Sequence, residues 1–303
     1  MSLSTPSAAS AAPARTFTSS DAAMLGVVLV WGTNYTLVKE ALGSMPPLAF
    51  ISIRFALAAM AMGALLLAVE GWKPLPWKTL ARLGVLGMVG NTVYQVLFIS
   101  GLAHTTAANT GMLTAVTPVM IAVLGAALGV ERITRSLVVS LVLAVVGMVL
   151  VVSVRGPELS AQTRWGDTLI LGSSVCWALY TVGIRTVGPE VSALRITALS
   201  MLTGAPGVVL AGAREVQALD FSQVSTGAWV ALVYSALIPL VAAYFLWGRS
   251  VQKVGTNRTA LYNTGVPVVA ALTAWAVRGE QPTAPQALGT AFILTGVLLS
   301  RRK

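Results

Sequence analysis

Charge is scarce in this sequence. Of its 303 residues only 10% are Asp, Glu, Lys or Arg and 56% are hydrophobic, whereas ordinary soluble domains carry about 25% charged residues. No soluble core could hide that much apolar surface. The apolar residues form continuous runs and do not alternate with polar ones, which predicts an all-α protein whose helices cross a lipid bilayer. The mean hydropathy of +0.80 agrees with that interpretation.

Residues that bind metals or carry out catalysis are also scarce. The one cysteine, Cys176, excludes an intramolecular disulfide, and the one histidine, His104, offers no cluster for a metal. No phosphate-loop pattern is present, which disfavours ATP hydrolysis. We therefore expect no metal site and no cofactor. All ten acidic residues fall at or near the ends of predicted spans, so the sequence predicts no membrane-embedded carboxylate for proton coupling.

The apolar runs give ten predicted transmembrane helices, each near the length of about 20 residues that crosses the hydrocarbon layer. They fall near 22–40, 47–69, 79–102, 106–129, 134–154, 166–187, 190–212, 226–248, 254–277 and 284–300. Residues 1–20 are rich in Ser, Ala, Thr and Pro and lack the apolar segment of a signal peptide, so we predict a disordered cytoplasmic tail. Residues 155–165 are a predicted linker and 301–303 a cytoplasmic C-terminus.

Lys and Arg are distributed unevenly between the two sides of this arrangement. If the N-terminus is cytoplasmic, 14 of the 20 lie inside and six outside, Arg54 among the six. The positive-inside rule then places both termini in the cytoplasm, which requires an even number of spans. We expect a multi-pass protein of the inner (plasma) membrane. The net charge of +10 is explained by these loops and does not indicate a nucleic-acid partner.

The sequence repeats itself. At an offset of 146 residues Asp21 pairs with Asp167, Trp31 with Trp177 and Lys39 with Arg185; at 149, Thr110 pairs with Thr259, Pro118 with Pro267 and Glu131 with Glu280. Arg54, near the start of the second span, has a counterpart in Arg195 near the start of the seventh. The repeats are residues 21–154 and 166–300, with five spans each. Because five is odd, the second copy enters the membrane inverted, as in many secondary transporters.

The chain resembles the EamA-type branch of the drug/metabolite transporter superfamily. The resemblance rests on Trp31-Gly32-Thr33-Asn34 with Lys39, Pro46-Pro47 followed by Arg54, Thr117-Pro118 leading to Glu131-Arg132-Ile133-Thr134, and Trp177, Pro267 and Gly279-Glu280. It implies a ten-helix fold of two inverted repeats and, in bacterial members, efflux of amino acids or related small metabolites. The chain looks most like the amino-acid exporters. Other members of the superfamily carry nucleotide sugars, triose phosphates or cationic drugs, so the family does not fix the substrate.

Aromatic and uncharged polar residues share helix faces within the predicted spans. Trp31, Asn34 and Tyr35 lie at i, i+3 and i+4, and Trp177 and Tyr180 repeat that face in the second half. The predicted substrate-binding residues are Trp31, Asn34, Tyr35, Asn91, Tyr94, Gln95, Phe98, Asn109, Thr110, Trp177, Tyr180, Tyr244, Trp247, Arg258, Tyr262 and Asn263. Arg258 is the candidate partner for a carboxylate. An alternative is that these polar residues join helices to each other. Pro118 and Pro267 interrupt their spans and are predicted hinges.

These features predict a secondary transporter that exports hydrophobic, aromatic or small neutral amino acids, or related metabolites, by alternating access. Its central cavity is expected to be aromatic and neutral, to lie between the two repeats, and to suit a zwitterion with an apolar side chain. The partners are a small solute and the bilayer, and no obligate protein partner is evident. One alternative is an integral-membrane enzyme acting on lipid or prenyl substrates, although the intramembrane groups for such chemistry are absent. Others are a transporter of another metabolite class, such as nucleotide sugars, and a non-transporting scaffold.

Overall fold

The computed structural model describes residues 19–130, 135, 138–139, 142–143, 145–147, 150, 161–279 and 281–299. Several predictions lie outside the described residues: most of the tail, most of the span at 134–154, residues 155–160 of the linker, Glu131, Glu280 and the C-terminus 301–303. The first helix begins at Ser19 and α8 begins at Ala161, so helix extends two residues into the predicted tail and five into the predicted linker.

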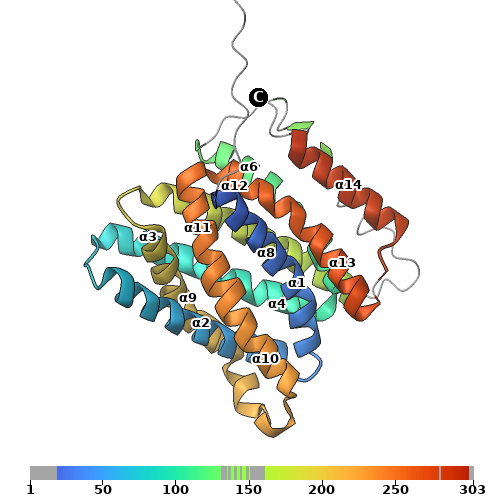
Figure 1. The fold of residues 1–303 in the computed structure, drawn as a ribbon, viewed down its shortest axis with the longest axis horizontal. Helices are drawn as coiled ribbons and strands as arrows, with labels where there is room; N and C mark the ends of the chain where they lie inside the picture. Colours follow the sequence, from blue (N-terminus) through green and yellow to red (C-terminus); the bar gives the residue numbers. More distant parts are fainter. Residues whose placement is uncertain are drawn as a thin grey trace, which may run out of the picture.

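The described residues are helical and contain no β-strand. In order (Figure 1) the α-helices are α1 (Ser19–Ala41), α2 (Pro47–Glu70), α3 (Trp77–Gly87), α4 (Tyr94–His104), α5 (Ala107–Thr114), α6 (Thr117–Ala127), α8 (Ala161–Val187), α9 (Ala193–Ala218), α10 (Thr226–Ser235), α11 (Ala243–Val254), α12 (Thr256–Tyr262), α13 (Val266–Arg278) and α14 (Ala284–Leu299). Each of the nine predicted spans outside 134–154 coincides with one or two of these helices. The start of α1 and the end of α14 lie toward the same end of the molecule (Figure 1).

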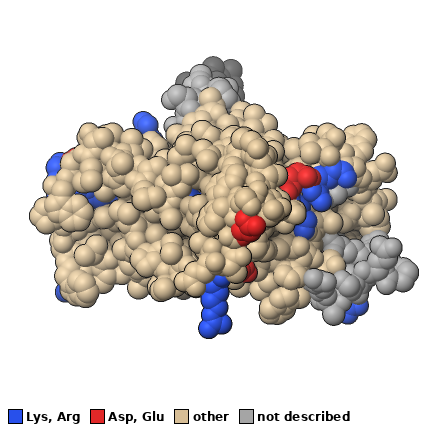
Figure 2. Space-filling view, turned by 90° about the horizontal axis from the view of Figure 1, so that it is seen from below, with Lys and Arg blue, Asp and Glu red and all other residues tan. Residues whose placement is uncertain are grey.

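Within the described residues, seven helical segments are long and apolar enough to cross a membrane. They are Asp21–Ala41, Pro47–Glu70, Trp77–His104, Asn109–Ala127, Thr163–Val187, Ala193–Ala218 and Thr226–Val254. Their outward faces carry aliphatic side chains such as Leu29, Met60 and Leu210, and Figure 2 shows a surface with few charged residues. Such a surface suits hydrocarbon and not water, so the prediction of a multi-span membrane protein is confirmed.

Four of the spans depart from regular α-helix, in two matching pairs. The third contains a π-helical stretch, η1 (Met88–Val93), and the eighth contains another, η3 (Ala236–Ala242). The fourth is broken between α5 and α6, and the ninth has a 3₁₀ turn, η4 (Asn263–Gly265), before α13. Pro118 and Pro267 each lie in the first turn after such a break, where a missing N–H is tolerated. The predicted interruptions of these spans are therefore present; their role as hinges stays a prediction.

Helices α2 and α9 pack against each other in opposite directions. At one end Glu215, near the end of α9, accepts hydrogen bonds from the backbone N–H groups of Leu48 and Ala49 at 2.8 and 3.0 Å. At the other end Glu70, the last residue of α2, accepts a hydrogen bond from the Ser192 hydroxyl at 2.6 Å. Each carboxylate thus lies at the N-terminus of the other helix, where negative charge is stabilised by the helix dipole.

The remaining helix contacts also occur in matching pairs. Helix α1 packs on α13 of the ninth span, and its counterpart α8 packs in the same way on α5 and α6 of the fourth span. Likewise α8 packs on α4 of the third span, and α1 packs on α10 and α11 of the eighth. Helices α4 and α8 approach very closely, since a Cβ added to Gly101 would lie 2.9 Å from the Gly166 carbonyl oxygen, and the reverse distance is also 2.9 Å. Small residues permit such close crossings in membranes.

Candidate functional site

A cavity lies at the centre of the helix bundle, between α1, α2 and α4 on one side and α8 and α11 on the other. It is lined by Trp31, Asn34, Tyr35, Arg54, Tyr94, Gln95, Phe98, Thr114, Thr117, Ser174, Trp177, Pro239, Leu240, Tyr244 and Asn263. Its volume is about 40 Å³, which suffices for a few water molecules, since one needs roughly 10–15 Å³ by this measure. A solute of amino-acid size therefore fits only after the lining side chains or helices move apart.

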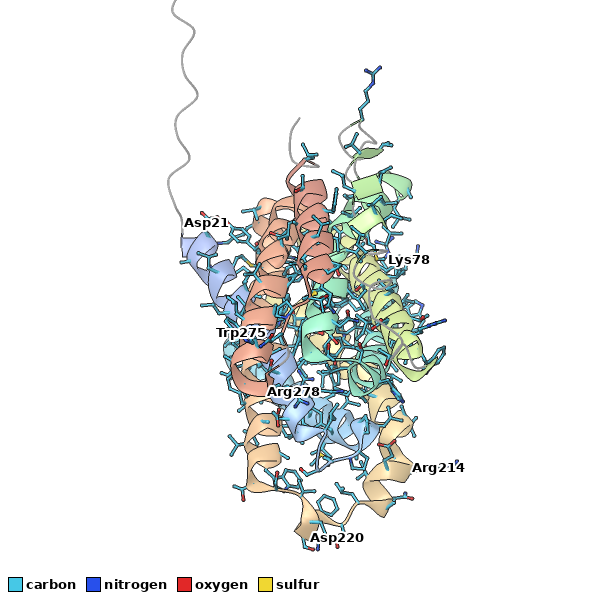
Figure 3. The ribbon with its side chains drawn as sticks, turned by 90° about the vertical axis from the view of Figure 1, so that its right-hand side faces the viewer. Asp21, Lys78, Arg214, Asp220, Trp275 and Arg278 are labelled. Carbon is cyan, nitrogen blue, oxygen red and sulfur yellow. The ribbon has the colours of Figure 1, made fainter. Side chains whose placement is uncertain are left out.

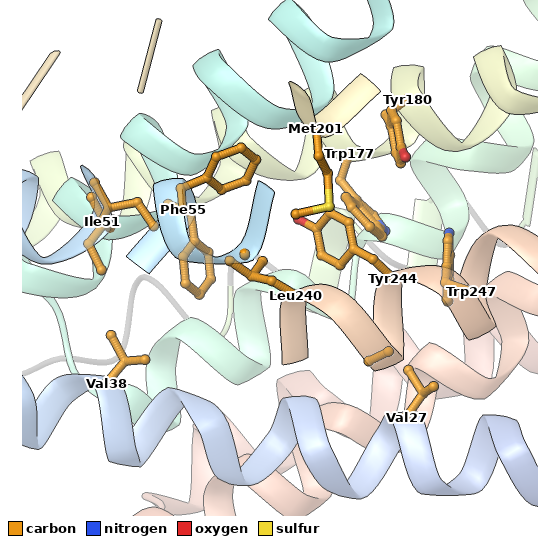
Figure 4. Packing of buried hydrophobic residues seen from close by; sticks show 14 of the residues in the cluster. Val27, Val38, Ile51, Phe55, Trp177, Tyr180, Met201, Leu240, Tyr244 and Trp247 are labelled. Carbon is orange, nitrogen blue, oxygen red and sulfur yellow. The ribbon is translucent and has the colours of Figure 1, made fainter. Parts of the chain in front are cut away.

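Aromatic rings from both halves of the chain form the wall of this cavity. The ring centroids of Trp31 and Trp177 are 5.5 Å apart in an edge-to-face arrangement, and those of Trp177 and Tyr244 are 4.9 Å apart. Trp247 lies 5.2 Å from Trp31, and Figure 4 shows Trp177, Tyr244 and Trp247 close together among buried apolar residues. Such pairs add about 0.5–1.5 kcal/mol each beyond their burial. The rings of Trp31, Trp177, Tyr244 and Trp247 thus form a firmly packed aromatic cage that draws on both halves of the chain.

Hydrogen bonds fix the polar edges of these rings. The Trp31 indole donates to the backbone carbonyl of Pro239, within the π-helical stretch η3, at 3.2 Å. The Gln95 amide donates to the Tyr244 hydroxyl at 2.9 Å. Both bonds join the first half of the chain to the second. Because π-helical turns recur at functional sites, the two matching stretches beside the cavity support a site here.

Nine of the sixteen predicted binding residues line the cavity and the other seven do not. The nine are Trp31, Asn34, Tyr35, Tyr94, Gln95, Phe98, Trp177, Tyr244 and Asn263. Tyr180 and Trp247 lie behind them, hydrogen-bonded to Ser200 and Thr181 respectively. Asn91 and Thr110 are fully buried outside the lining. Arg258 lies in α12, and its side chain lies outside the described residues.

The last two predicted residues, Asn109 and Tyr262, bind buried aspartates. Asp167 accepts hydrogen bonds from Asn109 and from Thr105, the latter at 2.7 Å, and Asp21 accepts one from Tyr262. Both aspartates are buried, with exposures of 2% and 7%. Both aspartates lie near the starts of their spans, as predicted, but nothing in the sequence indicated that they are buried; hydrogen-bond donors on the neighbouring span make that burial less costly. The two aspartates occupy equivalent places in the repeats, which favours a role in joining helices.

Six of the fifteen described lining residues were not among the predicted binding residues, and Arg54 is the one of these six that carries a charge. It lies in the interior of α2, its side chain is 2% exposed, and Nε and Nη1 have no hydrogen-bond partner among the described residues. Its guanidinium carbon lies 5.9 Å from the Phe50 ring centroid, within reach of a cation–π contact. The cavity is therefore aromatic, as predicted, but not neutral. An arginine within a transmembrane helix costs up to about 2.5–3.5 kcal/mol on insertion scales, and few contacts of Arg54 among the described residues offset that cost.

A signal for Arg54 was present in the sequence. It is the eighth residue of α2 and the one charged residue of the predicted span 47–69, so it lies about 10 Å from the helix end at 1.5 Å per residue. Counting it with the external loop charges overlooked this depth. Lys39 and Arg185, by contrast, lie at helix ends: Lys39 donates to the carbonyls of Leu102 and Ala103 at 2.8 and 2.9 Å, and Arg185 donates to the Gln252 carbonyl at 3.3 Å.

A second, wider depression opens to the surface where α1 meets α2. Its lining includes Lys39, Glu40, His104, Glu215 and Arg278. Arg278 of α13 forms an ion pair with Glu40 of α1, which ties the ends of these two helices together. Charges of both signs and the paired groups make this depression a hydrated surface feature, distinct in character from the aromatic central cavity.

Comparison with known proteins gives consistent results. The EamA-like transporter family matches residues 18–153 and again residues 164–302. The chain is 28% identical over 278 residues to the "Uncharacterized transporter YyaM" of Bacillus subtilis, covering 91% of each chain. It is 27% identical to the "Uncharacterized inner membrane transporter YedA" of Escherichia coli K12, covering 91% of this chain and 89% of that protein.

Two further similarities concern function and fold. The chain is 25% identical over 285 residues to the "Probable amino-acid metabolite efflux pump" of Salmonella typhimurium, covering 90% of this chain and 92% of that protein. A solved crystal structure with 20% identity superposes with a TM-score of 0.68, covering 93% of this chain and 96% of the other. The family expectation is confirmed: this membrane protein belongs to the EamA-like transporter family and is a transporter of small metabolites.

Proposed function

We propose that this transporter exports amino acids with apolar, aromatic or small neutral side chains, or closely related metabolites, through the central cavity. The observation that carries the proposal is the aromatic cage, to which Trp31 and Trp177, equivalent residues of the two repeats, both contribute. Rings with a few fixed polar groups suit a small solute that is apolar at one end and polar at the other. The name of the Salmonella relative supports the amino-acid class.

The mechanism we propose is alternating access by two inverted five-helix repeats. The antiparallel pair α2 and α9 and the matching helix contacts support an inverted relation of the halves, as does the twofold family match. In such folds one half moves against the other around a site near the midplane. The π-helical stretches and the breaks before Pro118 and Pro267 are the places where the moving spans can bend.

The test is flux of radiolabelled L-phenylalanine and L-leucine in proteoliposomes, with and without a pH gradient. We expect Trp31→Ala and Tyr94→Ala to lower the rate per amount of folded protein at least tenfold, because both remove cavity wall. Trp275→Ala is the matched control, since Trp275 is 53% exposed on the outer face of α13 and does not line the cavity. If the wild type moves no amino acid under any gradient, the proposed substrate class is wrong.

We further propose that both termini are cytoplasmic. Lys78 follows the Glu70 end of the α2 and α9 pair and the loop at Asp220 follows the Glu215 end, so the two lie at opposite ends of that pair; both are exposed, with Asp220 at the lower tip in Figure 3. In a Cys176→Ser background, a cysteine at Gln223 beside that loop should react with a membrane-impermeant maleimide in intact cells. A cysteine at Lys78 should react only after the cells are opened. The reverse pattern would overturn the orientation.

A further inference from the structure

Arg54 is a buried cation with too few hydrogen-bond acceptors among the described residues. Nε and Nη1 lack hydrogen-bond acceptors, and no carboxylate in the described part of the chain pairs with it. The side chain nevertheless lines the same cavity as Trp31, Trp177 and Tyr244. A guanidinium presents five N–H donors in a planar fork, and leaving such donors unsatisfied in a buried place is unfavourable.

We propose that Arg54 binds the anionic group of the transported solute, and that this group is a single carboxylate. The inference rests on the proposed transport of small solutes through this cavity and narrows their class. A carboxylate fits the arginine fork with two parallel hydrogen bonds and cancels its charge. The carboxylate of the bound solute thus supplies the hydrogen-bond acceptors that the described residues do not.

The charge of the lining distinguishes a carboxylate from other solutes. Arg54 is the one charged residue among the described residues that line the cavity. A phosphate group carries about −1.5 to −2 at neutral pH and would keep an excess negative charge in this apolar place. A cationic drug or amine meets a like charge there and no acidic partner in the described lining. One arginine matches one carboxylate.

A second unsatisfied group fits the other end of an amino acid. Asn34 is 3% exposed, lines the cavity, and its side-chain oxygen has no hydrogen-bond partner among the described residues. This oxygen can accept a hydrogen bond from an ammonium group, and the faces of Trp31 and Trp177 can attract the same cation. Arg54 and Asn34 therefore give the cavity one site for each charge of a zwitterion, with rings for an apolar side chain.

The first test compares L-phenylalanine with phenethylamine, which lacks the carboxylate, in proteoliposome flux. We expect the wild type to move the amino acid in preference to the amine. Arg54→Gln should raise the KM for L-phenylalanine at least tenfold and reduce that preference, and Arg54→Lys should be intermediate because it keeps the charge but not the fork. Arg214→Gln, which removes an exposed arginine of α9 (Figure 3), is the matched control and should behave as wild type.

The second test measures binding alone and does not depend on transport. Phenylacetate and phenylacetamide have nearly the same shape, but the amide replaces the charged carboxylate by a neutral group with one acceptor oxygen and an NH2 donor. Quenching of the cavity tryptophans reports their binding to protein in detergent. Wild type should bind the acid at least tenfold more tightly than the amide, and Arg54→Gln should bind the two alike while eluting as the same folded species. Equal binding of acid and amide by the wild type, or an unchanged KM for L-phenylalanine in Arg54→Gln, overturns the carboxylate site. If no amino acid is moved but acid binding still depends on Arg54, the amino-acid substrate is wrong and the carboxylate site stands.

Discussion

Arg54 of α2 and Arg195 of α9 occupy related places in the two repeats, but their surroundings differ. Arg195 lies in the first turn of its helix, 3.5 Å from the Glu70 carboxylate, and it donates to the backbone carbonyls of Gly71 and Lys73. Arg54 lies deeper, beside the aromatic cage, without an acceptor for Nε or Nη1 in the described part of the chain. One charge is used to join helix ends, and the other faces the cavity.

This difference shows how a duplicated transporter combines symmetry with a specific site. Equivalent contacts in both halves, such as those of Asp21 and Asp167, serve packing, and in the alternating access that we propose they would keep the two conformations similar in free energy. A solute with one carboxylate has no such symmetry, so a single arginine suffices to bind it. The comparison therefore assigns structural roles to paired charges and a functional role to the unpaired one.

The largest expected effect is an opposite response of the two arginines to removal of their charge. Arg195→Met should lower the free energy of unfolding by about 2–4 kcal/mol, because it leaves Glu70 and two carbonyls without their charged donor. Arg54→Met should leave stability unchanged or raise it by about 1–3 kcal/mol, since it removes a buried, unpaired charge. Unfolding followed by circular dichroism in detergent measures both.

The same two variants should also differ in their transport kinetics. Arg195→Met at a temperature where it is folded should keep the KM of the wild type, whereas Arg54→Met should lose its preference for carboxylates. Destabilisation of similar size in both variants would mean that Arg54 has a structural partner, and the comparison would fail.

Much of this fold could be predicted from the sequence, because each span is a local pattern. The predicted span 47–69 and the observed α2 (Pro47–Glu70) differ by one residue. Interruptions near Pro118 and Pro267 were predicted from the missing N–H of proline. The π-helical stretches η1 and η3 were not predicted, since no residue type demands them in the way that proline demands a break.

The site was predicted less completely. The helical spacing of Trp31, Asn34 and Tyr35 predicts that they share one face of the first span, and all three line the cavity. Whether a polar residue meets a partner depends on the neighbouring helix, which spacing within one helix does not reveal. Asn109 and Tyr262 were predicted to face solute and bind aspartates instead, while the isolation of Arg54 became visible only in three dimensions.

A smaller effect distinguishes the two ends of the α2 and α9 pair. Glu70→Gln should cost about 1–2 kcal/mol of stability, because it removes the charge that faces Arg195 at 3.5 Å. Glu215→Gln should cost less than about 1 kcal/mol, since the amide oxygen can still accept from Leu48 and Ala49 and only the attraction to the helix dipole is lost. Thermal unfolding of the two variants side by side measures the difference, and a larger loss for Glu215→Gln would contradict this account.

The smallest effect compares the basic residues that end the first and sixth spans. Lys39 makes short hydrogen bonds of 2.8 and 2.9 Å in a half-buried place, whereas Arg185 makes a bond of 3.3 Å at an exposed one. Both lie near the carbonyl end of another helix, where a cation stabilises by about 0.3–1 kcal/mol. Lys39→Met should therefore lower stability by about 1 kcal/mol and Arg185→Met by a few tenths at most, since exposed interactions are screened by water and salt. Raising the salt concentration should shrink the effect at Arg185 further and leave that at Lys39 nearly unchanged; equal salt dependence would show that the two helix ends are equally hydrated, and that the repeats are more alike here than their geometry implies.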